Sequence, residues 1–406
     1  MKIISCYIEN FGRLHSVRCE LESGLNMMDA GNGWGKSTFA AYLRAMFYGL
    51  PPGMSGTGYD KKDLRRNYRP WQGGKFGGRL LFEYDSRKLQ VERFFGDSPD
   101  EDSFSLTDAE TKEEITDFES EIGLELFGID AEGFERSAYI PQNELEFTGN
   151  DAIEDRLLGL LENDGSGKNT YRKALERLES AERALDRGDG RGKIPELKKK
   201  LSLLEDEIKS DERRLREKEA LLKSGNRLKR FLQARLYEDA EKERERLKEV
   251  IAKKRGEAEA GREGMKKEEE RLRQLEQTVQ FLREARAKLS DVYMNRMRTY
   301  FAAFLMEVTE ETGITLENDF SLKKTAAGEV RSIQSLSCGL RDLVQLCARF
   351  ALVDTLYEKE RPPIILDDVM TNLDDRNFER MMRCVKRLSE KGQVIYLTCH
   401  SSREVH

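Results

Sequence analysis

The chain of 406 residues lacks the cysteine patterns that mark a zinc site or a disulfide framework. None of its six cysteines forms a Cys-x-x-Cys pair or stands at metal-ligand spacing from one of the three histidines. Scattered cysteines of this kind are typical of reduced thiols in an intracellular protein. The six are Cys6, Cys19, Cys338, Cys347, Cys384 and Cys399.

Long apolar runs are also missing. No run approaches the ~18 residues of a membrane-spanning helix. The first residues, from Met1 to Tyr7, predict a strand and not a signal peptide. We therefore expect a soluble, cytoplasmic protein that does not act at a membrane.

An excess of positive charge is absent as well. The net charge is −6 and the isoelectric point is near 5.6, so any contact with nucleic acid must come from a local basic patch. Charged residues make up 36% of the chain and hydrophobic residues 38%. Lys, Arg and Glu gather in the middle and apolar runs near the ends, which indicates two kinds of segment.

This composition predicts three regions. Residues 1–165 and 301–406 alternate between predicted strands and helices, which is typical of α/β lobes. Residues 166–300 carry apolar residues at steps of three and four, a period that favours a coiled coil over a plain amphipathic helix bundle. Two such series are Ile194, Leu197, Leu201, Leu204, Ile208 and Leu272, Leu275, Val279, Leu282.

Glycines suggest where the predicted arm is interrupted. The cluster Gly188, Gly190, Gly192 predicts a break in the outgoing helix, and Ser224-Gly225-Asn226 is the candidate for the hairpin tip. Candidates for a second break are Gly256, Gly261 and Gly264.

A phosphate-binding loop lies near the N-terminus, between a predicted strand and a predicted helix. Its residues are Gly31-Asn32-Gly33-Trp34-Gly35-Lys36-Ser37-Thr38. Glycines let backbone N–H groups close around phosphate oxygens, Lys36 would reach the β- and γ-phosphates of ATP, and Ser37 would hold Mg²⁺. Ala30 stands where the usual motif has a glycine, and Gly31 is the candidate to ease that turn.

The acidic partner of this loop lies near the other end of the chain. Asp367 follows an apolar run that predicts a buried strand at residues 363–366, and it can order Mg²⁺ through water. Asp368 takes the place where a glutamate often polarises the attacking water. One nucleotide site built from both ends of the chain follows from this pair of motifs.

Further motifs appear in order between and after these two. Ser337 and Gly339 open a predicted helix at residues 336–357, Gln142 follows an apolar strand, and His400 follows the last predicted strand. Together the motifs resemble the ABC-type ATPase heads of the SMC, SbcC, RecF and RecN group, and most closely YhaN-type and SbcC-like repair ATPases of bacteria. The resemblance implies a split α/β P-loop head formed by N- and C-terminal lobes, with an inserted antiparallel coiled coil.

The resemblance also assigns roles. It implies catalytic Lys36, Gln142, Asp368 and His400, and Mg²⁺ ligands Ser37, Gln142 and Asp367. It implies a Q-loop at Gln142, a signature at Ser337 and Gly339, a D-loop from Asn372 to Asp374, and a homodimer that closes around two ATP molecules. ATP contacts would come from Asn32, Gly33, Trp34, Gly35, Lys36, Ser37, Thr38, Asp374 and, from the second head, Ser337 and Gly339.

Three departures from the family pattern limit these assignments: Ala30, Asp368 in place of glutamate, and an arm without the Cys-x-x-Cys hook of the SbcC family. DNA is the expected partner, and a nuclease subunit is a further candidate. A basic stretch could contact DNA phosphates, or equally an acidic protein. It comprises Lys61, Lys62, Arg65, Arg66, Arg69, Lys75 and Arg79 around Tyr68 and Trp71.

Three functions compete on this evidence. The first is an ATP-driven ATPase that acts on DNA in repair, recombination or chromosome maintenance. The second is a transport ATPase, which is disfavoured because its head would run without an inserted coil between P-loop and signature. The third is a slow ATP-dependent switch that gates an effector in phage defence, an alternative that Asp368 and the short arm keep open.

Overall fold

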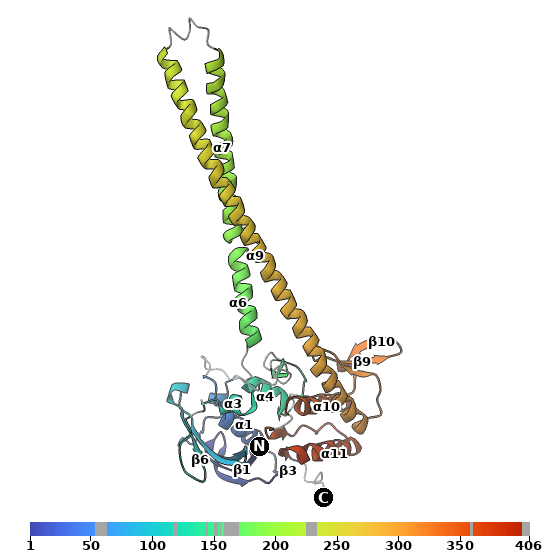
Figure 1. The fold of residues 1–406 in the computed structure, drawn as a ribbon. Helices are drawn as coiled ribbons and strands as arrows, with labels where there is room; N and C mark the ends of the chain where they lie inside the picture. The colour runs from blue at the N-terminus through green and yellow to red at the C-terminus, as the bar shows by residue number, and fades with distance from the viewer. Residues whose placement is uncertain are drawn as a thin grey trace. The chain divides into compact units, whose positions relative to one another are not determined.

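The computed structural model describes residues 1–52, 63–116, 118, 120–142, 145–149, 153–154, 156–157, 170–224, 234–357 and 360–399. The chain forms two compact units, the head (Met1–Lys168 with Lys288–His406) and the arm (Asn169–Ala287). The head is thus built from both ends of the chain, as the colours of Figure 1 show. Among the described helices, none has the length and apolar composition needed to cross a membrane.

A five-stranded antiparallel sheet forms one layer of the head. Its order is β2-β1-β4-β5-β6. Strands β4 and β5 form a hairpin, and its turn residues Asp85 and Ser86 both adopt positive φ, as in the tight turns that suit hairpin twist. The strands are β1 (Lys2–Phe11), β2 (Leu14–Glu20), β4 (Gly77–Tyr84), β5 (Arg87–Phe94) and β6 (Ser103–Asp108).

A four-stranded parallel sheet joins the two ends of the chain. Its order is β3-β12-β11-β7, so two C-terminal strands lie between two N-terminal ones. Strands β11 and β12 are buried along their whole length, which explains their continuous apolar runs. The bounds are β3 (Leu25–Asp29), β7 (Tyr139–Ile140), β11 (Ile364–Asp367) and β12 (Val394–Thr398).

Helix α1 (Lys36–Tyr48) lies between the two sheets, in contact with β4 and β5 on one side and β11 on the other. This position explains why almost the whole helix is buried. Helix α10 (Cys338–Leu356) is equally buried from Asp342 onward. The remaining head elements are α2 (Leu64–Asn67), η1 (Pro99–Glu101), α3 (Ile122–Phe127), α4 (Ala131–Ser137), β8 (Ile314–Leu316), β9 (Leu322–Ala326), β10 (Glu329–Ser332), η2 (Ile333–Ser335) and α11 (Asp375–Lys391).

The arm consists of α6 (Thr170–Leu185), α7 (Lys193–Ser224) and most of α9 (Ala234–Val308). Helices α6 and α7 follow one another along α9 in the antiparallel sense (Figure 1). Ion pairs between the helices record this direction: Glu179–Arg283, Lys193–Glu268, Glu205–Arg262, Asp211–Lys254 and Glu212–Arg255. The predicted antiparallel coiled coil is therefore present.

The glycine predictions for the arm had mixed outcomes. The break at Gly188 to Gly192 is present between α6 and α7, and all three glycines there have positive φ. The second break was wrong, because α9 continues through Gly256, Gly261 and Gly264. Single glycines cost a helix about 1 kcal/mol each, which a long packed helix can absorb. Of the predicted tip, Gly225 and Asn226 lie outside the described residues.

Helix α9 also extends past the arm. The head resumes at Lys288, earlier than the expected boundary at residue 300. The physical reason is that Tyr293, Met294 and Met297 of α9 are buried in the head core. The apolar pattern continues across this point, so the sequence shows no change of character there.

Candidate functional site

The loop between β3 and α1 has a backbone that requires glycine at two places. Gly33 and Gly35 adopt φ of 86° and 111°, in the left-handed region. A Cβ on Gly35 would also lie 2.9 Å from the Leu14 side chain. Gly31 has no such φ, and a Cβ there would meet nothing within 4 Å. Gly31 therefore does not take over the turn that Ala30 leaves without a glycine.

The first turn of α1 faces this loop and contributes no negative charge of its own. This turn holds no acidic residue, and no side chain caps it. Lys36 is buried, and its Nζ donates to the carbonyl oxygen of Ala30 at 2.7 Å. Free N–H groups, the helix dipole and an ammonium group together form an anion site. Asn32 and Trp34 are exposed beside it.

Two buried aspartates lie at the end of β11. Asp367 is 1% exposed and Asp368 is 5% exposed. Neither carboxylate oxygen of Asp367, nor Oδ1 of Asp368, has a hydrogen-bond partner among the described residues. Asp368 adopts φ of 53°, a strained value for a residue with a side chain, and its N–H donates to Leu397 at 2.9 Å.

The two ends of the chain meet at these carboxylates. Burial raises the pKa of Asp367 above its ordinary value, and the negative charge of Asp368 raises it further. The nearby Ser37 hydroxyl and the positive charge of Lys36 act in the opposite direction and lower it. Ser37 is thus close enough to act on the Asp367 carboxylate, although it forms no hydrogen bond that satisfies either oxygen. The predicted proximity of P-loop and acidic motif is present in the structure.

Buried oxygens without partners fit a hard divalent cation such as Mg²⁺, which takes oxygen ligands. The Ser37 hydroxyl and the Asp367 carboxylate supply two candidate ligands. Gln142 follows β7, whose Ile140 pairs with Leu366, so Gln142 lies at the same edge of the sheet as Asp367. Its side chain is exposed. No group of three metal-ligating side chains occurs within the described part of the chain, so phosphate or water oxygens would complete such a site.

The signature residues lie at the start of α10. Ser337 is the N-cap residue, yet its exposed side chain makes no capping hydrogen bond. Gly339 packs against the D-loop, since a Cβ there would lie 2.8 Å from the carbonyl oxygen of Asn372. The Asn372 side chain donates to Asp342 of α10 at 2.8 Å. Signature and D-loop therefore form one packed unit.

Asp374, an expected ATP contact, has a structural task of its own. Its carboxylate caps α11 by accepting from the N–H of Asn377 at 2.8 Å, and it also accepts from the Asn377 side chain at 3.0 Å. Such a cap stabilises the helix by about 1 kcal/mol. His400 lies outside the described residues. Cys399, the residue before it, contacts Asp368, and this contact raises the pKa of the Cys399 thiol.

Three residues near the site belong to none of the sequence motifs. Arg13, in the turn between β1 and β2, is exposed, and its Nη1 lies 3.5 Å from a Cβ built on Gly33. On α10, Gln345 accepts from the N–H of Phe147 at 2.7 Å. Arg349 donates to the carbonyl oxygens of Glu135 and Glu146 at 2.7 and 3.1 Å.

These contacts hold both flanks of the Q-loop against the signature helix. An arginine and a glutamine inside an apolar helix were the only signals that the sequence offered for Arg349 and Gln345. For Arg13 the sequence offered none, because strand turns commonly carry polar residues.

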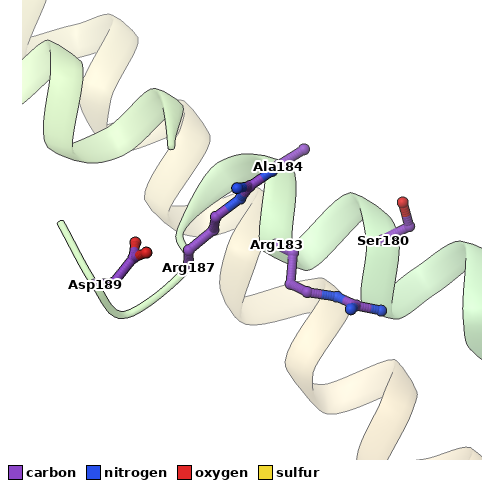
Figure 2. Close-up of a pocket in the computed structure, with 5 residues that line it drawn as sticks. All are labelled: Ser180, Arg183, Ala184, Arg187 and Asp189. Atoms are coloured by element: carbon purple, nitrogen blue, oxygen red, sulfur yellow. The ribbon is translucent and has the colours of Figure 1, made fainter. Parts of the chain in front are cut away.

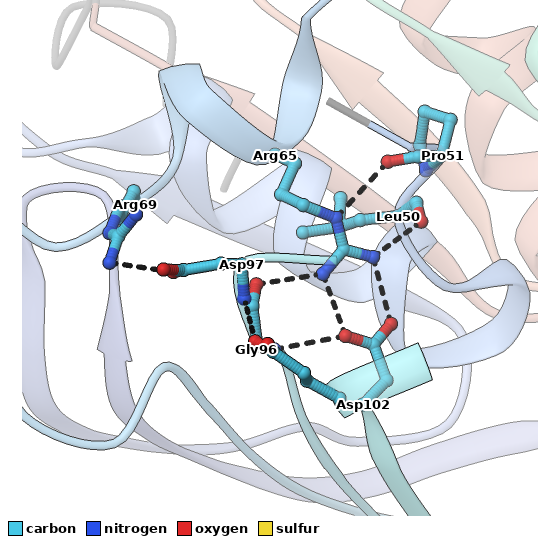
Figure 3. Close-up of polar contacts among 8 residues, drawn as sticks. Leu50, Pro51, Arg65, Arg69, Gly96, Asp97 and Asp102 are labelled. Atoms are coloured by element: carbon cyan, nitrogen blue, oxygen red, sulfur yellow. Dashed lines mark hydrogen bonds and ion pairs between the residues drawn. The ribbon is translucent and has the colours of Figure 1, made fainter. Parts of the chain in front are cut away.

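The basic stretch that could contact DNA phosphates, or equally an acidic protein, is not uniformly available at the surface. Arg65 is 3% exposed and pairs through two nitrogens with Asp102, at 2.6 and 2.8 Å (Figure 3). It also donates to the carbonyl oxygens of Leu50, Pro51 and Gly96. The inclusion of Arg65 in a DNA-binding patch was therefore wrong, because its donors are used inside the head.

The rest of the basic stretch has other surroundings. Arg69 is ion-paired with Asp97 and Arg79 with Glu92, while Trp71 is 95% exposed. Lys61 and Lys62 lie outside the described residues.

A hollow on the arm is unrelated to these motifs. Figure 2 shows it at the end of α6, lined by Ser180, Arg183, Ala184, Arg187 and Asp189. Arg183 is largely occupied by Glu179, to which it donates on the same helix. The hollow contains neither a buried charge nor a residue of the P-loop or acidic motif, and we assign no site to it.

Comparison with known proteins agrees with this architecture. The sequence matches the family profile described as AAA domain (AAA_23) over residues 5–290. No curated protein matches it. The structure is similar to the Smc head domain with a coiled coil and joint from Pyrococcus yayanosii, with a TM-score of 0.54 and 18% identity over 98% of this chain and 92% of that one.

A second solved structure is the Smc head domain with an extended coiled coil, bound to the C-terminal domain of ScpA, from Pyrococcus furiosus. It has 18% identity over 98% of this chain and 89% of that one, with a TM-score of 0.43. The first likeness shows that the fold is that of an SMC head with its coiled coil. Since the family profile covers well over half of the sequence, the chain belongs to the AAA domain family.

Proposed function

We propose that this protein is an SMC/SbcC-like ATPase that binds ATP with Mg²⁺ and hydrolyses it to ADP and phosphate. One observation carries the proposal: Asp367 and Asp368 are buried beside Ser37 and Lys36 at the N-terminus of α1, and three of their carboxylate oxygens find no hydrogen-bond partner in the described part of the chain. Buried carboxylates without partners are costly, and a bound cation with a phosphate group would offset that cost.

The chain's own groups have separate tasks in this proposal. Backbone N–H groups of residues 32–38 surround the phosphates, and Lys36 exchanges its bond to the Ala30 carbonyl for phosphate oxygens. Ser37, Asp367 and Gln142 would hold Mg²⁺, which would supply charge neutralisation on the phosphate oxygens. Arg13 adds a positive charge over the same loop.

Asp368 is the proposed group that polarises the attacking water, with His400 as a second candidate. Asp368 has a strained backbone, and its Oδ1 has no hydrogen-bond partner among the described residues. Both features are consistent with a functional position. An aspartate is one methylene shorter than the glutamate usual in the family, so we expect slow turnover.

Two heads would complete two sites. Ser337 is exposed and does not cap its own helix, so its hydroxyl is available to the ATP of a second copy. We propose an ATP-dependent homodimer that acts on DNA, with a nuclease subunit as a further partner. The support for DNA is the exposed Trp71 with Lys75, Arg69 and Arg79, a smaller basic group than the sequence predicted.

The test combines turnover with the oligomeric state. Wild type should form dimers by light scattering only with ATP and Mg²⁺. Asp368→Asn should lose turnover by about 10²- to 10⁴-fold while its ATP-bound dimers persist. Ser337→Arg should prevent dimers but keep ATP binding, whereas a control at an exposed position of α9, Thr299→Arg, should change neither. Absence of ATP binding by wild type would refute the proposal.

A second candidate, the slow switch that gates an effector, is favoured by the same short Asp368. The two candidates differ in their response to DNA. Turnover that DNA accelerates, with DNA binding at low salt, supports the first. Turnover that ignores DNA, with no DNA binding at low salt with or without ATP, supports the second and rules out the first.

A further inference from the structure

Two cysteines lie directly opposite each other in the antiparallel sheet of the head. Cys6 of β1 and Cys19 of β2 are register partners. Partners in such a ladder point to the same face, with Cα atoms about 4.5 or 5.5 Å apart. A disulfide needs Cα atoms about 4.4–6.8 Å apart, so either kind of pair can be bridged with little backbone movement.

The two thiols interact and differ in access. Cys6 is 3% exposed, whereas Cys19 is half-buried. The interaction with Cys6 holds the pKa of the Cys19 thiol below its ordinary value, and the interaction with Cys19 raises the pKa of the Cys6 thiol. This is the arrangement of an accessible attacking thiol beside a protected resolving thiol.

We propose that Cys6 and Cys19 form a reversible dithiol site, which a small disulfide such as oxidised glutathione converts into an intrachain disulfide. The Cys19 thiolate attacks one sulfur of oxidised glutathione, forming a mixed disulfide and releasing one glutathione, which takes a proton. Cys6 then loses its proton and attacks the Sγ of Cys19, releasing the second glutathione. Two protein thiols are oxidised, and one glutathione disulfide is reduced to two thiols.

The cysteine pair lies on the two strands whose connecting turn packs against the P-loop, so its oxidation should affect ATP binding. The turn between β1 and β2 presses on the P-loop, since a Cβ on Gly12 would lie 2.9 Å from Thr38, and one on Gly35 would lie 2.9 Å from Leu14. Because these contacts are close, even the small backbone movement that a bridge between β1 and β2 requires would shift the residues packed against the phosphate loop. We expect weaker ATP binding in the oxidised protein, by about fivefold or more; this part rests on the proposed function.

The test uses the full chain, reduced, freed of reductant and exposed to oxidised glutathione. Peptide mass mapping should show a Cys6–Cys19 bridge, with the loss of two titratable thiols that dithiothreitol restores. Cys19→Ser should form no bridge, whereas Cys338→Ser, which removes an exposed cysteine elsewhere, should form it as wild type does.

Two results would overturn the proposal separately. A mixed disulfide on Cys19 that persists, or no reaction at all, means that Cys6 does not resolve it and the site does not exist. A bridge that forms while the ATP dissociation constant stays unchanged removes the link to the P-loop but leaves the dithiol site. Failure of ATP binding in the reduced protein would instead count against the proposed function.

Discussion

Replacing Asp367 by asparagine should make the nucleotide-free protein more stable. The Asp367 carboxylate is 1% exposed, neither oxygen has a hydrogen-bond partner among the described residues, and Asp368 is beside it. A buried polar group left unsatisfied costs about 1–3 kcal/mol, and a charged group costs more. Asn removes the charge at constant size, so we expect a gain of about 1–3 kcal/mol in the free energy of unfolding.

The pH dependence of this gain follows from the pKa of Asp367, which burial raises above its ordinary value of 3.8. Below the ordinary value of 3.8, the Asp367 carboxyl is protonated in both the folded and the unfolded chain, so the substitution removes no charge. As the pH rises, the unfolded chain releases its proton first, so the native state of wild type loses stability until the raised pKa is passed. The advantage of Asp367→Asn should therefore grow as the pH rises above 3.8 and level off once the raised pKa of Asp367 is passed.

The assay is thermal unfolding without nucleotide at neutral pH, where 1 kcal/mol corresponds to roughly 2–4 °C for a domain of 150–250 residues. The matched control is Asp354→Asn, another buried aspartate, which is paired with Arg361 at 2.7 Å and Lys391 at 3.0 Å. Breaking that pair should destabilise by about 3 kcal/mol. The two substitutions should thus shift the melting temperature in opposite directions.

In the presence of nucleotide, wild type should have a higher melting temperature than Asp367→Asn, the reverse of the order without nucleotide. ATP with Mg²⁺ at a hundred times its dissociation constant stabilises a protein by about 2.7 kcal/mol, and the variant should lose most of this gain. If Asp367→Asn melts below wild type without nucleotide, as Asp354→Asn is expected to, the carboxylate has a partner and the argument for a cation there is refuted.

Three further experiments test other parts of the head. Gly35→Ala should weaken ATP binding at least tenfold in a titration, because its φ of 111° and the nearby Leu14 leave no room for a Cβ; unchanged affinity would contradict the loop geometry. Arg65→Ala should cost about 3 kcal/mol of unfolding free energy, and Arg69→Ala less than about 1 kcal/mol, by chemical denaturation; equal effects would contradict the burial of Arg65. Gly339→Ala should abolish ATP-dependent dimers in light scattering while the monomer still binds ATP.

Much of this architecture was predictable because its signals are local. Each of these signals spans only a short stretch of sequence. They are the P-loop, the apolar runs of β11 and β12 and the heptad series of the arm. The order of the motifs at the two ends implied that the ends meet, and the parallel sheet joins them. The wrongly predicted break in α9 shows where a local signal is weak, because single glycines do not stop a long packed helix.

The candidate site was predictable in its motifs but not in its surroundings. The burial of Arg65 against Asp102, the capping role of Asp374 and the pairing of Arg349 with the Q-loop flanks depend on neighbours that no sequence period encodes. The sequence alone does not show whether the N–H groups of an arginine donate hydrogen bonds to water or to buried carbonyl groups.

The sequence by itself determined the chemistry of this protein: a phosphate loop, an acidic strand end and a coiled-coil arm between them. Only the tertiary structure decided that two C-terminal strands lie between N-terminal ones, that the Asp367 oxygens find no partner among the residues described and that Cys6 faces Cys19. The physical reason is that periodicity and turn chemistry act over a few residues. Strand order and burial, by contrast, are settled by packing between segments that lie far apart in the chain.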